Sequence, residues 1–95
     1  MIVTLRQMQY VVSVAKHGSF SKAAEECNAD QSTVSQQIKT FEERLGITIF
    51  DRNTLPITIT NEGKELVVKC ESIINQVDEL IQPFKRPKSD SLLNR

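Results

Sequence analysis

The strongest constraint on the fold lies between residues 66 and 84, where apolar side chains recur with a fixed period. One column alternates spacings of four and three residues, and a second column repeats every seven residues beside it. The nine side chains of this apolar stripe are Leu66, Val67, Cys70, Ile73, Ile74, Val77, Leu80, Ile81 and Phe84. A 3.5-residue period held for nearly three heptads predicts one long helix with a continuous apolar face.

A helix with this stripe must cover the rest of the domain, a partner helix, or both, because a small protein rarely leaves so large an apolar face exposed. We expect Thr60 or Asn61 to cap the helix and Pro83 and Pro87 to stop it near Phe84. The period favours a homodimer formed through this helix, with packing inside one chain as the alternative. The predicted interface consists of Leu66, Cys70, Ile73, Ile74, Val77, Leu80, Ile81 and Phe84.

Three shorter helices are expected before residue 47. Residues 4–17 carry one apolar stripe and end at Gly18, which suits a left-handed helix end. Ser21 is a good N-cap for a short second helix in "KAAEEC". "NAD" then forms a turn, and Asp30 caps a third helix that runs to about Leu45. The core face of this third helix is predicted to be Val34, Ile38, Phe41 and Leu45.

The hydrophobic period changes after Gly46. "ITIF" and "ITIT" are short β-branched runs on either side of "DRNTLP", which predicts a two-stranded hairpin with an irregular loop. Two helices joined by a tight turn and followed directly by a hairpin have the order of a winged helix-turn-helix. In that arrangement the second helix of the pair enters a major groove of DNA. The predicted fold is therefore mainly α, with three helices, a two-stranded wing and a long dimerisation or linker helix.

The polar face of residues 31–45 is unusual because it holds amide and hydroxyl groups rather than charges. Opposite the core face lie Ser32, Gln36, Lys39, Thr40 and Glu43, and no acid occurs between Asp30 and Phe41. Amides and hydroxyls can hydrogen-bond base edges, and a helix N-terminus attracts phosphate. An ordinary solvated face remains the alternative, although such faces more often carry Glu and Lys.

Composition narrows the class of function. The chain has 12 basic and 12 acidic residues, so its zero net charge argues against a general polyanion binder. Its two cysteines are 43 positions apart and it has a single histidine, so no zinc site or disulfide framework is recognisable. No nucleophile–base pair or carboxylate dyad is apparent either. We expect no enzyme, no metal and no cofactor.

No signal peptide precedes residue 5, and the longest apolar runs are too short to span a bilayer. We therefore expect a cytoplasmic protein with no membrane partner. The polar segment "KRPKSDSLLNR", residues 85–95, is expected to be a flexible tail.

The stretch "SFSKAAEECNADQSTVSQQIKTFEERLGITIFDR", followed by "ITITNEG", resembles the N-terminal DNA-binding domain of LysR-type bacterial transcriptional regulators. The resemblance covers residues 4 to about 84. It implies a winged helix-turn-helix domain at 1–59, a linker helix at 60–84 that pairs antiparallel with a partner subunit, and binding to double-stranded DNA. The DNA contacts that it implies are Ser21, Lys22, Gln31, Ser32, Thr33, Ser35, Gln36, Lys39 and Arg52.

Three departures from the family pattern concern charge. Position 36 is often basic but is Gln36 here, the wing carries no cation beyond Arg52, and the turn ends in Asp30. Each missing cation removes about one unit from the salt dependence of DNA binding. The family's effector domain is also absent, so we expect no small-molecule effector in this chain. The leading hypothesis is a homodimeric, sequence-specific DNA-binding regulator of transcription. The alternative is a protein-interaction module that pairs with another regulator through the long helix and binds DNA weakly.

Overall fold

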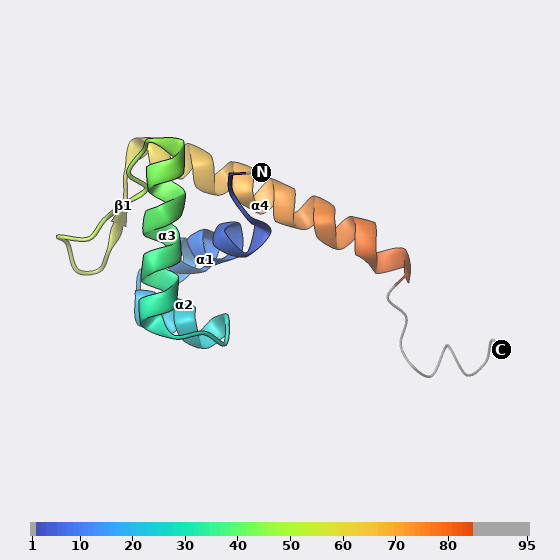
Figure 1. Cartoon of the computed structure of the whole chain (residues 1–95), viewed down its shortest axis with the longest axis horizontal. Helices are drawn as coiled ribbons and strands as arrows, with labels where there is room; N and C mark the ends of the chain where they lie inside the picture. Colours follow the sequence, from blue (N-terminus) through green and yellow to red (C-terminus); the bar gives the residue numbers. More distant parts are fainter. Residues whose placement is uncertain (1, 85–95) are drawn as a thin grey trace.

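The computed structural model describes residues 2–84, and the predicted flexible tail at 85–95 lies outside them. The described chain is mainly α, with a two-stranded hairpin between the third and fourth helices (Figure 1). Its elements are α1 (Leu5–His17), α2 (Phe20–Glu26), α3 (Gln31–Leu45), β1 (Phe50–Asp51), β2 (Thr58–Ile59), α4 (Asn61–Ile81) and the 3₁₀ helix η1 (Gln82–Phe84). This order confirms the predicted winged helix-turn-helix followed by a long helix.

The first three helices and the start of α4 enclose a single core, and together with the hairpin they form what we call the head. Each helix contributes a stripe that the 3.6-residue period places on one face. The side chains at the centre of the core are Val11, Val14, Ala23, Val34, Ile38, Phe41 and Ile49, each at most 1% exposed. Because α1 contacts α2, α3 and α4, it is the element around which the head is assembled.

The start of α2 differs from the prediction. Ser19, not Ser21, is the N-cap, and its hydroxyl accepts a hydrogen bond from the Lys22 N–H at 3.1 Å. The helix therefore begins at Phe20, whose ring is buried and meets Phe50 edge to face at 6.2 Å. Burial of this ring in the first turn moves the helix start two residues upstream. Ser21 consequently lies exposed on the first turn of α2.

The third helix confirms most of its predicted core face, but Leu45 is a correction. Val34, Ile38 and Phe41 are buried, whereas Leu45 is 37% exposed. The chain reverses immediately after it, at Gly46, in the left-handed conformation with φ of 72°. Ile49, after this reversal, is fully buried in the core. Asp30 occupies the N-cap position, although its side chain makes no capping hydrogen bond.

The wing is a shorter ladder than the sequence predicted. Only Phe50 of the first run and Thr58 and Ile59 of the second enter the ladder, with Phe50 opposite Ile59 and Asp51 opposite Thr58. The N–H groups of Ile49 and Phe50 donate instead to the carboxylate of Glu42 on α3, at 2.7 and 3.3 Å. The backbone at the start of β1 is thus tied to α3, where it would otherwise have extended the ladder.

The fourth helix begins as predicted, with Thr60 as its N-cap accepting from the Gly63 N–H at 3.0 Å. Gly63 lies against Ile49, directly before β1, and a Cβ atom on Gly63 would stand 2.4 Å from the Ile49 carbonyl oxygen. The regular helix ends at Ile81, and residues 82–84 continue as the 3₁₀ turn η1. Among residues 2–84, no helix has the length and apolar character needed to cross a membrane.

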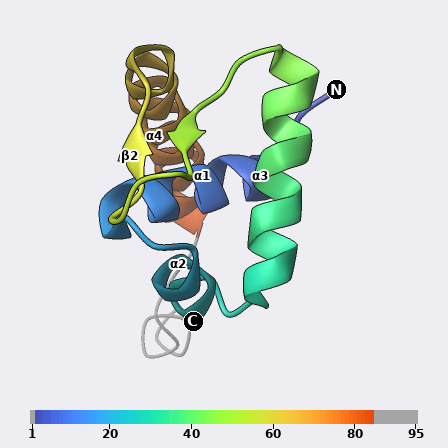
Figure 2. The same cartoon turned by 90° about the vertical axis from the view of Figure 1, so that its left-hand side faces the viewer.

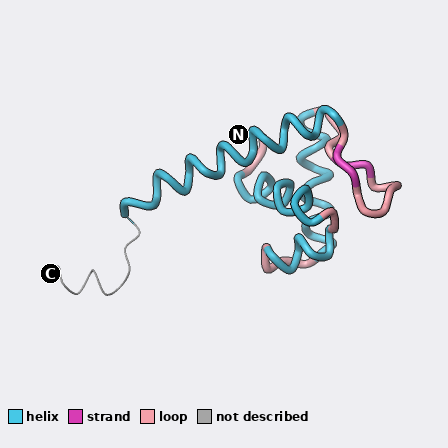
Figure 3. The backbone as a smooth tube through the Cα atoms, turned by 180° about the vertical axis from the view of Figure 1, so that it is seen from behind, coloured by secondary structure: helices cyan, strands magenta, loops and turns pink. Residues whose placement is uncertain are grey.

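In residues 2–84, the part of the apolar stripe after Cys70, which we call the outer part of α4, lies outside the core of the head. Cys70 is 1% exposed and lies in the core of the head, and Leu66 is half-buried and packs against that core. Burial also raises the pKa of the Cys70 thiol. A heptad pattern does not distinguish a partner in the same chain from one in another, so a contact of these two residues with a second chain stays a prediction. Beyond Cys70 the helix leaves the head, as Figure 3 shows from behind.

Candidate DNA interface

The first half of α3 and the wing lie on one face of the head, turned away from the outer part of α4 (Figure 2). On this face the side chains of α3 are polar, and no acid occurs in its first turn. The predicted contacts Gln31, Ser32, Thr33, Gln36 and Lys39 are all exposed there, and Ser35 is half-buried. A helix N-terminus with exposed amides and hydroxyls can approach phosphates and base edges together.

The two predicted contacts on α2, Ser21 and Lys22, are also exposed. The turn between α2 and α3 contains Asn28 with φ of 55°, a left-handed conformation that asparagine tolerates better than most residues. The Ala29 N–H closes this turn by donating to the Ala24 carbonyl at 2.9 Å. The turn thereby fixes the direction in which α3 leaves α2.

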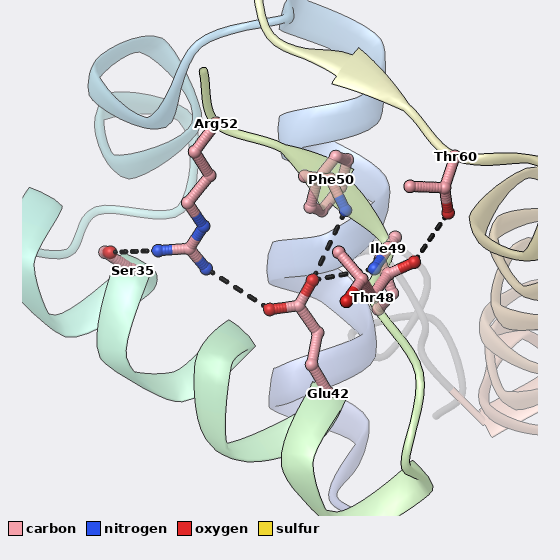
Figure 4. A network of polar contacts seen from close by, with 7 residues as sticks. All are labelled: Ser35, Glu42, Thr48, Ile49, Phe50, Arg52 and Thr60. Carbon is pink, nitrogen blue, oxygen red and sulfur yellow. Dashed lines mark hydrogen bonds and ion pairs between the residues drawn. The ribbon is translucent and has the colours of Figure 1, made fainter.

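Arg52, at the base of the wing, is turned towards α3 rather than away from the protein (Figure 4). Its guanidinium donates to the Ser35 hydroxyl at 2.9 Å and lies 3.5 Å from the Glu42 carboxylate. The same group stacks over the ring of Phe20, 4.6 Å from the ring centroid. Arg52 therefore connects the wing to α3 and α2, a role that the sequence alone did not reveal.

Glu42 is the centre of this arrangement and was not among the predicted site residues. Its side chain is only 12% exposed; one oxygen accepts from two N–H groups of the wing and the other faces Arg52. A carboxylate that satisfies several buried donors is costly to remove, because the donors are left unpaired. The available signal was its position four residues after Ile38 and three before Leu45, which places it beside the core face of α3.

A second polar contact, between Gln7 of α1 and Gln37 of α3, was also missed. Gln7 is 3% exposed and donates through Nε2 to the Gln37 Oε1 at 3.1 Å. Its own Oε1 accepts from the Thr4 N–H at 2.9 Å, which completes a capping box at the start of α1. One side chain thus caps α1 and holds the back of the recognition helix.

Glu26 connects α2 to α1 through contacts with Ser13 and Lys16. Ser13 donates to its carboxylate at 2.5 Å and Lys16 at 3.1 Å, and these contacts lower the pKa of Glu26 to about 2. The His17 ring nitrogen Nε2 lies 3.4 Å from the same carboxylate. Since α2 carries the turn that leads into α3, this cluster helps to set the position of the recognition helix.

The exposed, polar helix α3, with a hairpin tied to it through Ser35 and Glu42, defines a winged helix-turn-helix module of the DNA-binding class. Comparison with known families agrees: residues 5–64 match the model of the bacterial regulatory helix-turn-helix proteins of the lysR family. The chain belongs to this family of transcriptional regulators.

Related proteins match along most of this chain. The HTH-type transcriptional regulator CzcR of Bacillus thuringiensis is 42% identical over 83 residues, and CfxR of Cupriavidus necator is 39% identical over 93 residues. The matches cover 87% and 95% of this chain but only 28% and 29% of the relatives. The chain thus spans less than a third of the length of these curated relatives and corresponds to their DNA-binding domain.

Solved structures show the same fold. The BenM DNA-binding domain in complex with benA site 1 DNA has a TM-score of 0.83 and 33% identity, covering 88% of this chain and 94% of that one. Vibrio fischeri DarR in complex with DNA also has a TM-score of 0.83, with 29% identity over 98% of this chain and 31% of that one. Both relatives were solved bound to DNA.

Proposed function

We propose that this chain binds double-stranded DNA sequence-specifically as a homodimer and regulates bacterial transcription in the cytoplasm. The observation that carries the proposal is the exposed, acid-free first half of α3 beside the wing. Gln31, Ser32, Thr33, Ser35 and Gln36 supply groups that hydrogen-bond base edges in a major groove. The likeness to two DNA-bound relatives supports this assignment.

The remaining predicted contact residues are suited to bind the phosphates of the DNA backbone. Lys39 on α3 and Ser21 and Lys22 on α2 flank the base-reading surface and are exposed. The Arg52 side chain is 34% exposed and contacts Ser35 and Glu42. A phosphate bound by Arg52 would therefore compete with these two residues for its guanidinium group. Because this face has few lysine and arginine side chains that are not already paired, its affinity for DNA phosphates and the salt dependence of that affinity are small for a protein of this class.

The proposed division of the chain is a DNA-binding domain at 1–59 and a linker helix at 60–84. The dimer forms through the outer part of α4, which belongs to the linker helix. Ile73, Leu80, Ile81 and Phe84 are 42%, 67%, 45% and 80% exposed, and Ile74 and Val77 lie half-buried beside them. Side chains of this kind in two columns are suited to pair with the same surface of a second chain. Two such heads would contact half-sites about one helical turn, or a multiple of it, apart.

A random-duplex selection with the purified chain tests the proposal, followed by gel shifts on the selected sequence at several salt concentrations. We expect one recurrent motif of two half-sites. Gln31→Ala should relax the base preference and leave the circular dichroism spectrum unchanged, whereas Glu79→Ala, an exposed change on α4, should leave both unchanged. Failure to enrich any duplex at low salt would overturn the proposal.

The second candidate is a protein-interaction module that uses the same α4 surface to pair with another regulator. The zero net charge and the absence of a cation between Asn53 and Ile57 favour it. It predicts that the chain forms mixed dimers with a full-length regulator and gains DNA affinity only in them. Specific binding by the chain alone in the selection experiment would exclude this candidate.

A further inference from the structure

The tip of the wing is apolar and fully open to solvent. Leu55 is 93% exposed, the highest value among the large hydrophobic side chains that are exposed in residues 2–84. Pro56 beside it is exposed as well. In Figure 1 the loop projects from the end of the head that is opposite to the outer part of α4. The tip therefore belongs to the DNA-facing end of the molecule and is remote from the proposed dimer surface.

The loop that carries Leu55 is tied down at both ends. The Asn53 N–H donates to the Asp51 carboxylate at 2.9 Å, and the Thr54 hydroxyl is bonded to Asp51 and Thr58 at 3.2 and 3.1 Å. On the return side the Ile57 N–H donates to the Gly18 carbonyl at 3.4 Å. These bonds hold the backbone in a fixed arch, so Leu55 is presented at the same place relative to α3.

The wing tip offers DNA no positive charge. Residues 53–57 contain no lysine or arginine, and Arg52 points back to Ser35 and Glu42. An ionic contact with phosphate is therefore excluded at the tip itself. An apolar side chain at such a place can instead enter a minor groove, where leucine and proline are among the residues that proteins insert.

We infer that Leu55 enters the minor groove beside the major-groove site of α3 and selects A·T pairs there through its shape. The inference rests on the proposed function, since it assumes that α3 lies in the neighbouring major groove. The physical basis of selection is the 2-amino group of guanine, a donor on the floor of the minor groove that A·T pairs lack. A leucine side chain cannot hydrogen-bond this donor and would bury it unsatisfied.

The test uses the intact chain and its selected duplex with three versions of the flanking pairs: A·T, G·C and inosine·C. Inosine lacks the 2-amino group, so it resembles A·T in the minor groove and G·C in the major groove. We expect the A·T and inosine·C flanks to bind alike and the G·C flank to bind about tenfold more weakly. Leu55→Ser should abolish this difference, and hydroxyl-radical protection of the flank should disappear with it.

A matched control is Ile2→Ser, because Ile2 is also exposed, at 59%, but lies beside Arg44 near the far end of α3. It should keep the full flank preference. Leu55→Arg should raise affinity for all duplexes and increase the salt slope by about one unit. The inference is overturned if the wild type binds all three flanks equally, if inosine·C behaves as G·C, or if Leu55→Ser retains the preference. Absence of binding to any duplex would overturn the proposed function as well, which distinguishes the two failures.

Discussion

The two halves of α4 carry the same apolar pattern but have different surroundings. In the inner half Val67 and Cys70 are 9% and 1% exposed and pack in the core of the head. In the outer half Leu80 and Phe84 are 67% and 80% exposed. A 21-residue helix is about 31 Å long. This exceeds what the small head covers, so one stripe both completes a core and provides a surface for association.

A heptad pattern indicates which face of a helix must be buried but not which surface covers that face. Figure 1 shows α1 crossing beneath the first turns of α4 and leaving the rest uncovered. Paired substitutions in the inner and outer halves therefore separate folding from association, and the variants below are ordered by their expected effect on the stability of the head.

The largest effect is expected for Val67→Asp, compared with the same change at Leu80. A carboxylate at the buried position 67 has no partner and should destabilise the head by about 4 kcal/mol or more. Thermal unfolding followed by circular dichroism measures this difference. If Val67→Asp unfolds at the wild-type temperature, the inner half of α4 is not part of the core.

A smaller loss is expected for Gly63→Ala, because its Cβ would stand 2.4 Å from the Ile49 carbonyl oxygen. The strand or the helix must shift, which should cost about 1–3 kcal/mol. The control is Asn75→Ala on the exposed outer half, where alanine should be neutral or slightly stabilising. Equal midpoints of urea unfolding for the two variants would show that α4 does not approach β1 this closely.

Leu80→Asp should leave the folding of an isolated head within about 0.5 kcal/mol of wild type and act on association instead. We expect monomers in sedimentation velocity, where the wild type gives dimers. The melting temperature of the wild type should also rise with protein concentration, and that of the variant should not. Dimers that persist in Leu80→Asp would show that pairing occurs through another surface.

The smallest effect concerns acid stability. The pKa of Glu26 is lowered to about 2 by Ser13 and Lys16, from the ordinary value of 4.5. The unfolded state therefore binds the proton more readily, and the stabilisation is present above about pH 4.5 and is lost as the pH falls towards 2. Glu26→Gln should reduce the change in the free energy of unfolding over this pH range. Glu79→Gln, at an exposed position of α4, should leave that change as in the wild type. An unchanged profile in Glu26→Gln would refute the contact with Ser13 and Lys16.

Much of the fold was predictable because its signals are local. The periods of α1, α3 and α4, the left-handed glycines at 18 and 46, and the N-cap Thr60 all depend on residues within one or two turns of each other. The exposed polar half of α3 was predicted in the same way. The N-cap of α2 was predicted at Ser21, whereas Ser19 caps the helix because Phe20 is buried in its first turn.

The connections between elements were not predictable because they join residues far apart in the chain. Gln7 meets Gln37, and Arg52 meets Ser35 and Glu42, only once the helices have packed. A sequence lists the donors and acceptors without their partners, so Arg52 appeared free to bind DNA and Glu42 appeared to be surface.

By itself, the sequence determined the family, the order of the elements and the polar character of the recognition helix, since each follows from residue types at short spacing. The tertiary structure alone decided where the apolar stripe of α4 divides between core and surface, and that the one arginine of the wing is held by the recognition helix. It also decided that Leu55 is exposed at the wing tip. These features depend on which surfaces come together, and the distance between them in space is not encoded by their distance along the chain.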